Sequence, residues 1–449
     1  MRLRKNIEFY MSDQIKSQDL EMQHLTNGQF KVDIYFLKSL CDIALIRTCI
    51  SEPLFKSQSA GEFANHLDSS IDCKRLENVD EIQSKLLKGE VIIQFDSQVW
   101  VLQAANTINN TPAETSIETS LQGPSLALAE NMTASINLIR QRYSSSGLLV
   151  MEKSIGKISE TKLSILYDQE HVNNRVLQKL LQQLSHVNAD IVQSIGQLDA
   201  LISTKKIRLF PTMLITERPD RIALNLATGK IIILMEGTPF ALIAPAVFFD
   251  FMSAMDDVYQ PYLISKSLVL MRYIALLLSI ILPALYVAIV SYNPEIFRIQ
   301  LTVSIAGTRA AVPYPSFIEV FIMLFLFEAL VEASIRLPKA IGPTATTVGG
   351  LILGQAAQQA GLISSIMIIV TSSVAISNFV IPVNAMSFAI RFLKYPLVLL
   401  AMFFGITGVI AGAYCILLYL ANLKCFGEPY FRIFTREHSP TGYKEGDIA

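Results

Sequence analysis

The sequence has few of the residues and none of the short motifs on which most enzymes depend. It contains 5 His and 5 Cys, and the cysteines form no CxxC pair and have no His at zinc-ligand spacing. The patterns GxGxxG, GxxxxGK(S/T), HExxH and GxSxG do not occur. We therefore predict a protein that is not an enzyme, holds no metal or cofactor and keeps its thiols free.

Charge is scarce in the second half of the chain. The 449 residues carry 37 Lys and Arg against 38 Asp and Glu, and 51% of them are hydrophobic, with a mean hydropathy of +0.42. Residues 232–425 hold only 9 of these basic and 8 of these acidic residues. Such a chain is too apolar for an ordinary soluble protein, so we expect a polar half followed by a membrane half. The net charge of −1 gives no indication of nucleic-acid binding.

The N-terminus lacks the apolar core of a signal peptide. The segment MRLRKNIEFYMSDQIKSQDLEMQ is basic at its start but has no long apolar run. Basic residues precede the first long apolar run, at Arg218, Arg221, Lys230, Lys266 and Arg272. Both features predict that the polar half stays in the cytoplasm.

The polar half contains two segments that align at a constant offset. GEVIIQFDSQVWVL (89–102) and GKIIILMEGTPFAL (229–242) each begin with Gly, continue as a strand, turn at an acidic residue and return through an aromatic one. This pattern predicts two β-hairpins, each preceded by a short helix that ends at the glycine. Apolar hairpins resemble one another by chance, which is the alternative. Agreement of helix, glycine and hairpin favours two related α/β subdomains.

The rest of the polar half fits this division. A helix and a strand are predicted within 131–156, a second strand at 161–168 and an amphipathic helix at 171–187. We expect an exposed connector at 106–124, rich in Thr, Asn and Ser. The predicted subdomains are residues 1–121, with a leading segment, and 122–262.

The segment that ends the second subdomain, residues 244–262, is rich in Phe, Met and Tyr. This composition predicts a helix lying at the membrane surface. We expect its two neighbouring carboxylates, Asp256 and Asp257, to be solvated rather than catalytic.

Long apolar runs predict an all-α membrane domain at 263–423 with about five crossings, followed by a polar tail at 424–449. The expected spans are 273–291, 316–335, two between 340 and 390, and 395–423. Five crossings place the basic tail opposite the polar half, against the positive-inside tendency. We therefore expect one re-entrant or split segment, with the Gly-rich residues 341–355 as the candidate.

Charges inside the second expected span, within FEALVEASIRLPK (327–339), stand out. Glu328, Glu332 and Arg336 fall on one helical stripe, with Glu319 on the opposite face. Charges at membrane depth are costly and usually face a bundle interior or a water-filled path. The carboxylates are thus candidates for an ion path or gate. In the alternative, Glu332 pairs with Arg336 and only anchors the helix, while Arg336 and Lys339 mark a membrane boundary.

A second feature of the membrane half is a stripe of small residues. Its members are Gly350, Gly354, Ala357 and Gly361. Such stripes allow helices to pack closely, within or between chains. Gln355 and Gln359 lie beside the stripe and are candidates to line a polar channel or to bond across a helix interface.

Several further stretches occur in order along the chain, and they are ERPDRIALNLATGKIIILMEGTPFALIAPAVFFDF (217–251), LPALYVAIVSYNPE (282–295), VPYPSFIE (312–319), FEALVEASIRLPKAIGP (327–343), LILGQAAQQAGLIS (351–364) and FVIP (379–382). Together these stretches resemble the A subunits of bacterial spore germinant receptors, the GerA family. The segment GPSLALAENMTASINLIRQR (123–142) follows the pattern more weakly.

The resemblance implies a subunit with a two-part cytoplasmic N-terminal domain and a helical domain in the spore inner membrane. It implies partners as well, a transporter-like B subunit and a lipoprotein C subunit. Family A subunits are thought to self-associate, as pentamers, into a channel that releases monovalent cations when a germinant binds. A secondary transporter with broken helices and a non-conducting membrane scaffold are the alternative functions.

The chain departs from the family pattern at two places. Gln122, Ser125 and Leu126 stand where relatives carry a charged patch, which puts in doubt any contact made by that patch. Ala310 and Ala311 precede VPYP where relatives carry an acidic residue and a glycine.

Overall fold

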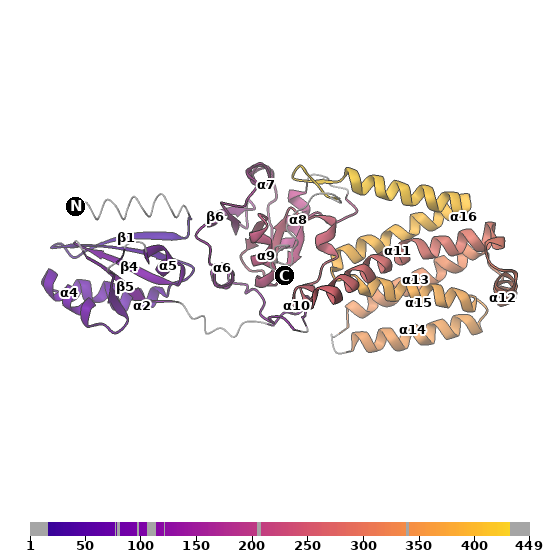
Figure 1. Cartoon of the computed structure of the whole chain (residues 1–449), viewed down its shortest axis with the longest axis horizontal. Helices are drawn as coiled ribbons and strands as arrows, with labels where there is room; N and C mark the ends of the chain where they lie inside the picture. The colour runs from indigo at the N-terminus through magenta and orange to yellow at the C-terminus, as the bar shows by residue number, and fades with distance from the viewer. Residues whose placement is uncertain are drawn as a thin grey trace.

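The protein forms two α/β subdomains and a helical domain that follow one another along the long axis of the molecule (Figure 1). The computed structural model describes residues 17–76, 78, 81–96, 98–105, 114–120, 122–203, 208–337 and 341–431, apart from the side chains of residues 343 and 345–347. All statements below concern these residues.

The first subdomain is an antiparallel five-stranded sheet of order β1-β2-β4-β5-β3. Its strands are β1 (Leu20–Thr26), β2 (Lys31–Leu37), β3 (Cys73–Arg75), β4 (Glu90–Phe95) and β5 (Gln98–Gln103). Its helices are α2 (Ile43–Ile46), η1 (Arg47–Ser51), α3 (Glu52–Lys56), α4 (Ala60–Ser69) and α5 (Ile82–Leu87). The sheet has one core on each face, because nearly every residue of β4 is buried.

The second subdomain repeats this architecture, with strand order β6-β7-β9-β10-β8. Its strands are β6 (Leu148–Ile155), β7 (Thr161–Asp168), β8 (Leu214–Thr216), β9 (Ile231–Met235) and β10 (Ala241–Ala244). Its helices are α6 (Met132–Arg142), α7 (Asn174–His186), α8 (Ile195–Ile202) and α9 (Pro219–Ala227). As predicted, α7 is amphipathic and packs its apolar face on the sheet.

The two sheets share one topology, as the aligned segments predicted. In each sheet an outer hairpin is followed by helices, then by the far edge strand, and finally by a helix and a central hairpin. The glycines that end α5 and α9 both have positive φ, +78° at Gly89 and +80° at Gly229. A side chain at Gly229 would lie 2.3 Å from the carbonyl oxygen of His171, so this helix end requires glycine.

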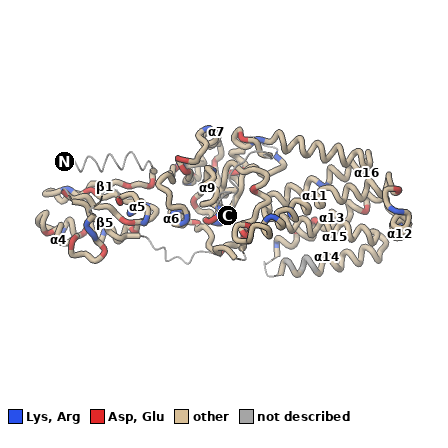
Figure 2. Tube along the Cα trace, viewed as in Figure 1, with Lys and Arg blue, Asp and Glu red and all other residues tan. Residues whose placement is uncertain are grey.

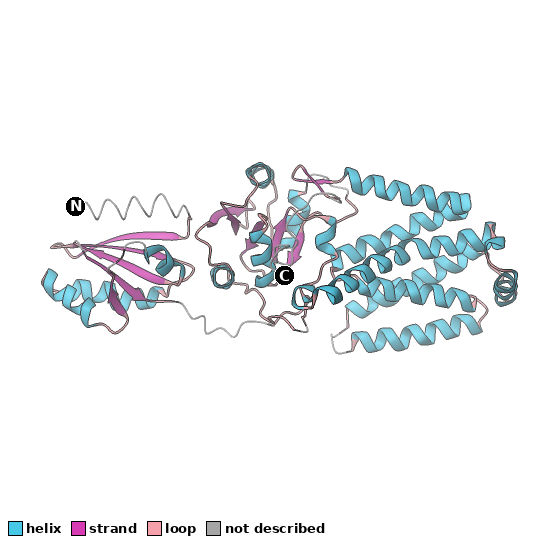
Figure 3. Ribbon diagram, viewed as in Figure 1, coloured by secondary structure: helices cyan, strands magenta, loops and turns pink. Residues whose placement is uncertain are grey.

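The helical domain is a bundle whose helices run side by side, with one short helix seen end-on at the far end (Figure 3). Its elements are α11 (Tyr262–Tyr292), η4 (Pro294–Ile296), α12 (Ile299–Arg309), α13 (Ser316–Ile335), α14 (Gly342–Gln359), α15 (Ser365–Val380) and α16 (Asn384–Asn422). The expected spans 273–291 and 316–335 lie within α11 and α13, and α14 and α15 lie between residues 340 and 390. The expected span 395–423 is wrong, because it crosses a break in α16 at Gly405.

Only two helices of the described residues, α11 and α16, are long and apolar enough to cross a membrane by length and composition. The prediction of five such apolar spans is therefore wrong in number. The helix α13 has the expected length but carries three glutamates, and α15 is apolar but has 16 residues. The glutamines and threonines of α14 lower its hydropathy.

The last helix, α16, folds back on itself at Gly405, whose φ of 57° and ψ of −138° are not helical. A side chain at Gly412 would lie 2.4 Å from Leu397 Cδ1, although fifteen residues of straight helix span ~22 Å. Thus α16 consists of two antiparallel arms, residues 384–404 and 406–422, that meet at the far end of the domain (Figure 1). The predicted split segment at 341–355 is wrong, since most of it belongs to the continuous helix α14.

The predicted surface helix at 244–262 is also wrong. This segment forms the short helices η3 (Phe248–Phe251) and α10 (Asp256–Tyr259). Phe251 and Met252 have no exposed surface, because they pack into one core shared by the second subdomain and the helical domain. Its Phe and Met residues are thus mostly buried between two parts of the protein, whereas Tyr259 and Tyr262 are exposed. Asp257, expected to be solvated, is buried as well.

The expected polar tail begins with a small hairpin, β11 (Lys424–Cys425) and β12 (Glu428–Pro429). Cys425 and Phe426 enter the core of the second subdomain, and the Phe248 N–H donates to the Tyr430 carbonyl at 3.0 Å. The helical domain therefore begins and ends at the second subdomain.

Candidate functional site

Charged residues are sparse along the helices of the helical domain (Figure 2). The carboxylates singled out from the sequence, Glu319, Glu328 and Glu332, lie on α13. The structure gives each of them a different set of partners, so they do not form one site.

Glu328 faces two cations of the first arm of α16. Arg391 Nε donates to Glu328 Oε1 at 2.7 Å, and its Nη2 donates to the same oxygen. Lys394 Nζ lies 3.7 Å from Glu328 Oε2. The side chain of Lys394 is fully buried, while that of Glu328 is 30% exposed. We name Glu328, Arg391 and Lys394 the interhelix charge cluster.

The interhelix charge cluster carries one surplus positive charge. Glu328 Oε2 and Lys394 Nζ have no hydrogen-bond partner among the described residues. The rings of Phe388 and Tyr395 lie 5.0 Å from Arg391 Cζ and 5.6 Å from Lys394 Nζ, and such contacts compensate a buried cation only in part. The sequence analysis missed both cations, although they are the only charges in the long apolar segment 384–422.

Glu332 pairs with Arg336, which is the alternative to an ion path given in the sequence analysis. It accepts a hydrogen bond from Arg336 Nη2 at 2.9 Å, and the two side chains are 59% and 78% exposed. This pair lies at the end of α13 nearest the second subdomain. Lys339, the other predicted boundary residue, lies outside the described residues.

Glu319 is fully buried in the first turn of α13, at the end of the bundle far from the α/β subdomains. Its carboxylate accepts from the backbone N–H of Ser364, which begins α15, and from Tyr286 Oη at 3.3 Å. Arg309 Nε lies 3.6 Å away. Glu319 thus ties the ends of three helices together, and its contacts are those of a structural residue.

The stripe of small residues is only partly a packing surface. A side chain at Gly350 would meet Leu330 of α13 at 3.5 Å, and Ala357 is buried. Gly361 is not on the helix: it has φ +68°, and a side chain there would lie 3.2 Å from the Ala311 carbonyl oxygen. It belongs to the turn that leads to α15.

The outer face of α14 carries the two glutamines. Gln355 and Gln359 are both exposed, and a side chain at Gly354 would have open space within 4 Å. An exposed amide on an apolar helix needs a polar neighbour such as water or another chain. The glutamines are therefore accessible for such a contact.

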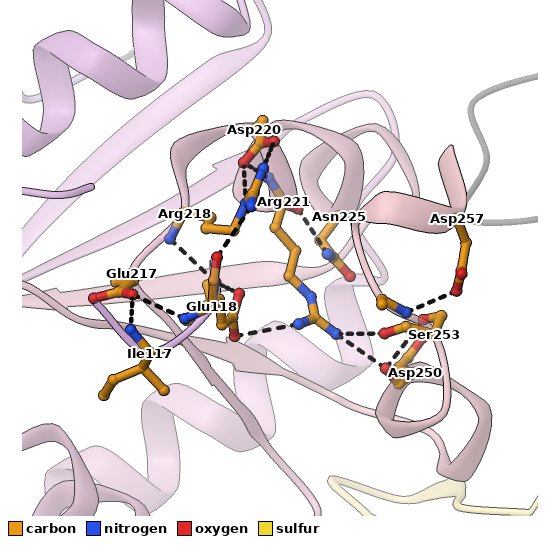
Figure 4. A network of polar contacts seen from close by, with 12 residues as sticks. Ile117, Glu118, Glu217, Arg218, Asp220, Arg221, Asn225, Asp250, Ser253 and Asp257 are labelled. Carbon is orange, nitrogen blue, oxygen red and sulfur yellow. Dashed lines mark hydrogen bonds and ion pairs between the residues drawn. The ribbon is translucent and has the colours of Figure 1, made fainter. Parts of the chain in front are cut away.

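A second polar network, absent from the predicted sites, lies in the second subdomain (Figure 4). The buried carboxylate of Glu217 accepts the consecutive N–H groups of Ser116, Ile117 and Glu118 at 2.6, 2.5 and 3.0 Å. Three N–H groups aimed at one carboxylate form an anion nest. The described connector residues 114–120, here named the connector strap, are mostly exposed as expected, and Glu217 holds their backbone against the subdomain.

Arg218 and Asp220 form a buried ion pair beside this nest. Arg218 Nε and Nη2 donate to Asp220 at 3.1 and 2.7 Å, and Tyr259 Oη donates to the same carboxylate at 2.8 Å. Burial raises the pKa of Asp220, but the bonds from Arg218 and Tyr259 outweigh it, so the pKa lies below its ordinary value. Burial and the neighbouring Asp220 raise the pKa of Tyr259 to about 12.

Arg221, the next basic residue, reaches the opposite side of the network. Its Nη1 donates to Glu118 Oε1 at 3.2 Å, and its Nη2 donates to the carbonyls of Asp250 and Ser253 at 3.1 and 3.3 Å. A pocket of about 40 Å³ beside Arg221 and Asp257 has room for a few water molecules. It is too small for a typical small-molecule ligand.

Two α/β subdomains of one topology, joined to a bundle with apolar helices and buried charges, define a membrane-associated protein with a large polar region. The sequence profile described as Bacillus/Clostridium GerA spore germination protein matches residues 5–442. The chain therefore belongs to the GerA family of spore germination proteins.

Curated relatives agree with this assignment. The chain is 35% identical to spore germination protein B1 of Bacillus subtilis (strain 168) over 78% of its length and 73% of the relative. It is 30% identical to spore germination protein KA of the same organism over 95% of its length and 81% of the relative. It is 29% identical to spore germination protein GerQA of Bacillus cereus over 99% of its length and 90% of the relative. These relatives indicate a germinant receptor A subunit.

A solved structure is also similar, the N-terminal domain of the A subunit of the Bacillus megaterium spore germinant receptor GerK3. The match has a TM-score of 0.39 and 22% identity, over 55% of this chain and 95% of that one.

Proposed function

We propose that this A subunit self-associates into a ligand-gated channel that releases cations during spore germination and has no enzymatic activity of its own. The observation that carries this proposal is a pair of exposed amides, Gln355 and Gln359, which follow the exposed apolar residues Leu351 and Ile352 on α14. Amides in contact with lipid are unfavourable, whereas amides around a water-filled axis are solvated.

We propose that Glu328 acts at the gate of this channel rather than on its wall. Arg391 donates to its carboxylate and Lys394 Nζ lies 3.7 Å from it, so its negative charge is already neutralised by neighbouring cations. The interhelix charge cluster instead joins α13 to the first arm of α16. Separation of these two helices would change the packing of the bundle. Glu332, which is exposed, remains a candidate for the mouth of the path.

The proposed topology has six crossings, and it includes three helices, α13, α14 and α15, that are too short or too polar to qualify as spans by length and composition alone. The crossing elements are α11, α13, α14, α15 and the two arms of α16. An even number is supported by the docking of β11 and β12 onto the second subdomain, because both ends of the helical domain must then lie on one side. Exposed apolar side chains such as Leu270 and Phe403 suit contact with lipid.

The end of the bundle nearest the α/β subdomains is proposed to face the cytoplasm, with the protein in the spore inner membrane. Lys266, Arg336 and Lys424 lie at this end, in agreement with the positive-inside tendency. The proposed domains are residues 1–121, 122–262, 263–423 and a C-terminal segment from 424. The proposed partners are a transporter-like B subunit, a lipoprotein C subunit and copies of this chain in a pentameric ring.

The test is the oligomeric state and ion flux of the purified full chain in liposomes. A ring with cation flux that Gln355→Leu and Gln359→Leu together reduce about tenfold or more supports the channel. The matched control is Gln23→Leu, an exposed change in the first subdomain, which is expected to leave the flux unchanged. A monomer or dimer that exchanges solutes supports a transporter instead, and a ring without flux supports a scaffold.

A further inference from the structure

The second subdomain is connected to α11 through one short turn, residues 250–254, followed by α10. This turn includes the last two residues of η3, and Ser253 Oγ donates to the Asp250 carbonyl at 3.1 Å. Two arginines from different elements donate further bonds to carbonyl groups of the turn. They are Arg221 of α9 and Arg272 of α11.

Arg221 holds the 250–254 turn from the side of the subdomain. Its Nη2 donates to the carbonyls of Asp250 and Ser253 at 3.1 and 3.3 Å. The Asp250 carboxylate is fixed in turn by Lys230 Nζ at 2.6 Å and by the Val247 N–H at 2.8 Å. The turn is therefore held to α9 and to Lys230, which precedes β9, by several charge-assisted bonds.

Arg272 holds the same turn from the side of α11. Its Nη1 donates to the Met252 carbonyl at 3.1 Å, and its guanidinium forms a two-point ion pair with Asp257, with 2.9 Å from Nη2 to Oδ1. Asp257 Oδ2 also accepts the Ala254 N–H at 2.9 Å. Asp257 and Arg272 are both buried, so a shift of either one disturbs the turn.

Arg221 also binds the connector strap, through Glu118. Its Nη1 donates to Glu118 Oε1 at 3.2 Å, and Glu118 Oε2 accepts from Thr216 Oγ1 at 2.8 Å. The Glu118 carbonyl also accepts from Arg218 Nη1 at 3.0 Å. The strap lies in the segment that links the first subdomain to the second, so its position depends on both.

We propose that the 250–254 turn couples the connector strap to α11. Glu118 fixes Arg221, Arg221 and Arg272 bind carbonyls of the same turn, and Arg272 is part of α11. Displacement of the strap frees Arg221, loosens the turn and allows the first turns of α11 to move. The consequence for gating rests on the proposed function, whereas the coupling itself does not.

The test is hydrogen–deuterium exchange of the full chain in lipid nanodiscs, read at the backbone amides of residues 266–272. Glu118→Ala removes both side-chain bonds of Glu118 and is expected to speed exchange there about tenfold, although Glu118 does not touch α11. The matched control is Glu114→Ala, a change of an exposed carboxylate in the same strap, which should leave residues 266–272 unchanged.

A second variant tests whether Glu118 and Asp257 act on α11 through the same turn. Asp257→Asn should also speed exchange of residues 266–272 about tenfold, and the double variant should add little to either single one. Additive effects would mean that Glu118 and Asp257 act independently, which overturns the coupling. If Glu118→Ala does not fold, Glu118→Gln serves instead, because it keeps the side-chain volume and removes the charge. This variant should speed the exchange of residues 266–272 about threefold.

The inference is also overturned if Glu118→Ala speeds exchange of residues 114–120 and leaves residues 266–272 at the wild-type rate. Because exchange needs no ion flux, the result is independent of the channel test. A chain that conducts no ions but shows linked exchange contradicts only the proposed function. A conducting chain with unlinked exchange contradicts only the coupling.

Discussion

Two of the buried charge networks of this protein, one in the second subdomain and one in the helical domain, differ in how completely they are satisfied. In the second subdomain, Arg218 and Arg221 each bind carboxylate or carbonyl oxygens at about 3 Å. In the helical domain, the interhelix charge cluster leaves Lys394 Nζ and Glu328 Oε2 without hydrogen bonds among the described residues. A fully satisfied network fixes one structure, whereas a partly satisfied one is a place where an alternative arrangement costs little. The comparison thus suggests a rigid anchor in the subdomain and a movable contact between helices.

The largest effect should come from opening the network in the subdomain. Arg218→Ala leaves the buried Asp220 carboxylate without its cation, which should destabilise the subdomain by about 3–5 kcal/mol. Thermal unfolding of the full chain in detergent measures this loss of stability. The control is Arg175→Ala, an exposed change on α7, expected within about 0.5 kcal/mol of wild type. Equal melting temperatures of Arg218→Ala and Arg175→Ala would show that the buried network contributes no more to stability than an exposed residue.

The helical domain should respond differently to the loss of each cation. Arg391→Met removes the close partner of Glu328 and should cost about 3 kcal/mol. Lys394→Met removes a surplus buried charge and should be neutral or stabilising by about 1 kcal/mol. Thermal unfolding of the two variants in the same detergent distinguishes them. A larger loss for Lys394→Met would show that Lys394 is the essential partner.

The subdomain network should also lose stability in acid. The pKa of Asp220 is lowered in the folded state, so its contribution is present above the unfolded pKa of about 4 and is lost as the pH falls through the folded value. The stability difference between wild type and Asp220→Asn should therefore be constant near pH 7 and shrink below about pH 4. Denaturant unfolding over this pH range measures the difference. A difference that stays the same in acid would contradict the proposed ionisation.

The smallest effect should come from the exposed pair on α13. Glu332→Gln breaks a bond between two largely exposed side chains, which is worth about 0.3–0.5 kcal/mol in helices. Its melting temperature in detergent should match that of wild type, whereas Glu328→Gln should lower it. Equal losses for the two glutamate variants would remove the distinction between a surface pair and a buried cluster.

Elements encoded by local patterns were predicted well from the sequence. The strand at 161–168 and the span at 316–335 have the same ends in the structure, as β7 and α13. Both aligned segments form hairpins within sheets of the same order. Periodicity and glycine placement report on a few neighbouring residues, which is the range over which these elements are decided.

Features that depend on distant partners were missed. Glu328 and Arg391 are 63 residues apart in sequence, so no helical spacing relates them. The segment 244–262 was assigned to the membrane surface because its aromatic content is the same whether lipid or protein buries it. The connector strap is polar, yet Glu217 binds its backbone, and an acidic residue alone does not reveal a nest. The fold-back at Gly405 lies in an apolar run where the sequence shows no interruption.

The return of the chain to the second subdomain has a consequence for biosynthesis. Cys425 and Phe426 fill part of the core of that subdomain, yet the ribosome makes them after the entire helical domain. The core of the subdomain therefore stays incomplete until the helical domain has been synthesised and α16 has turned back at Gly405. The last residues of the helical domain thus complete the fold of the polar half.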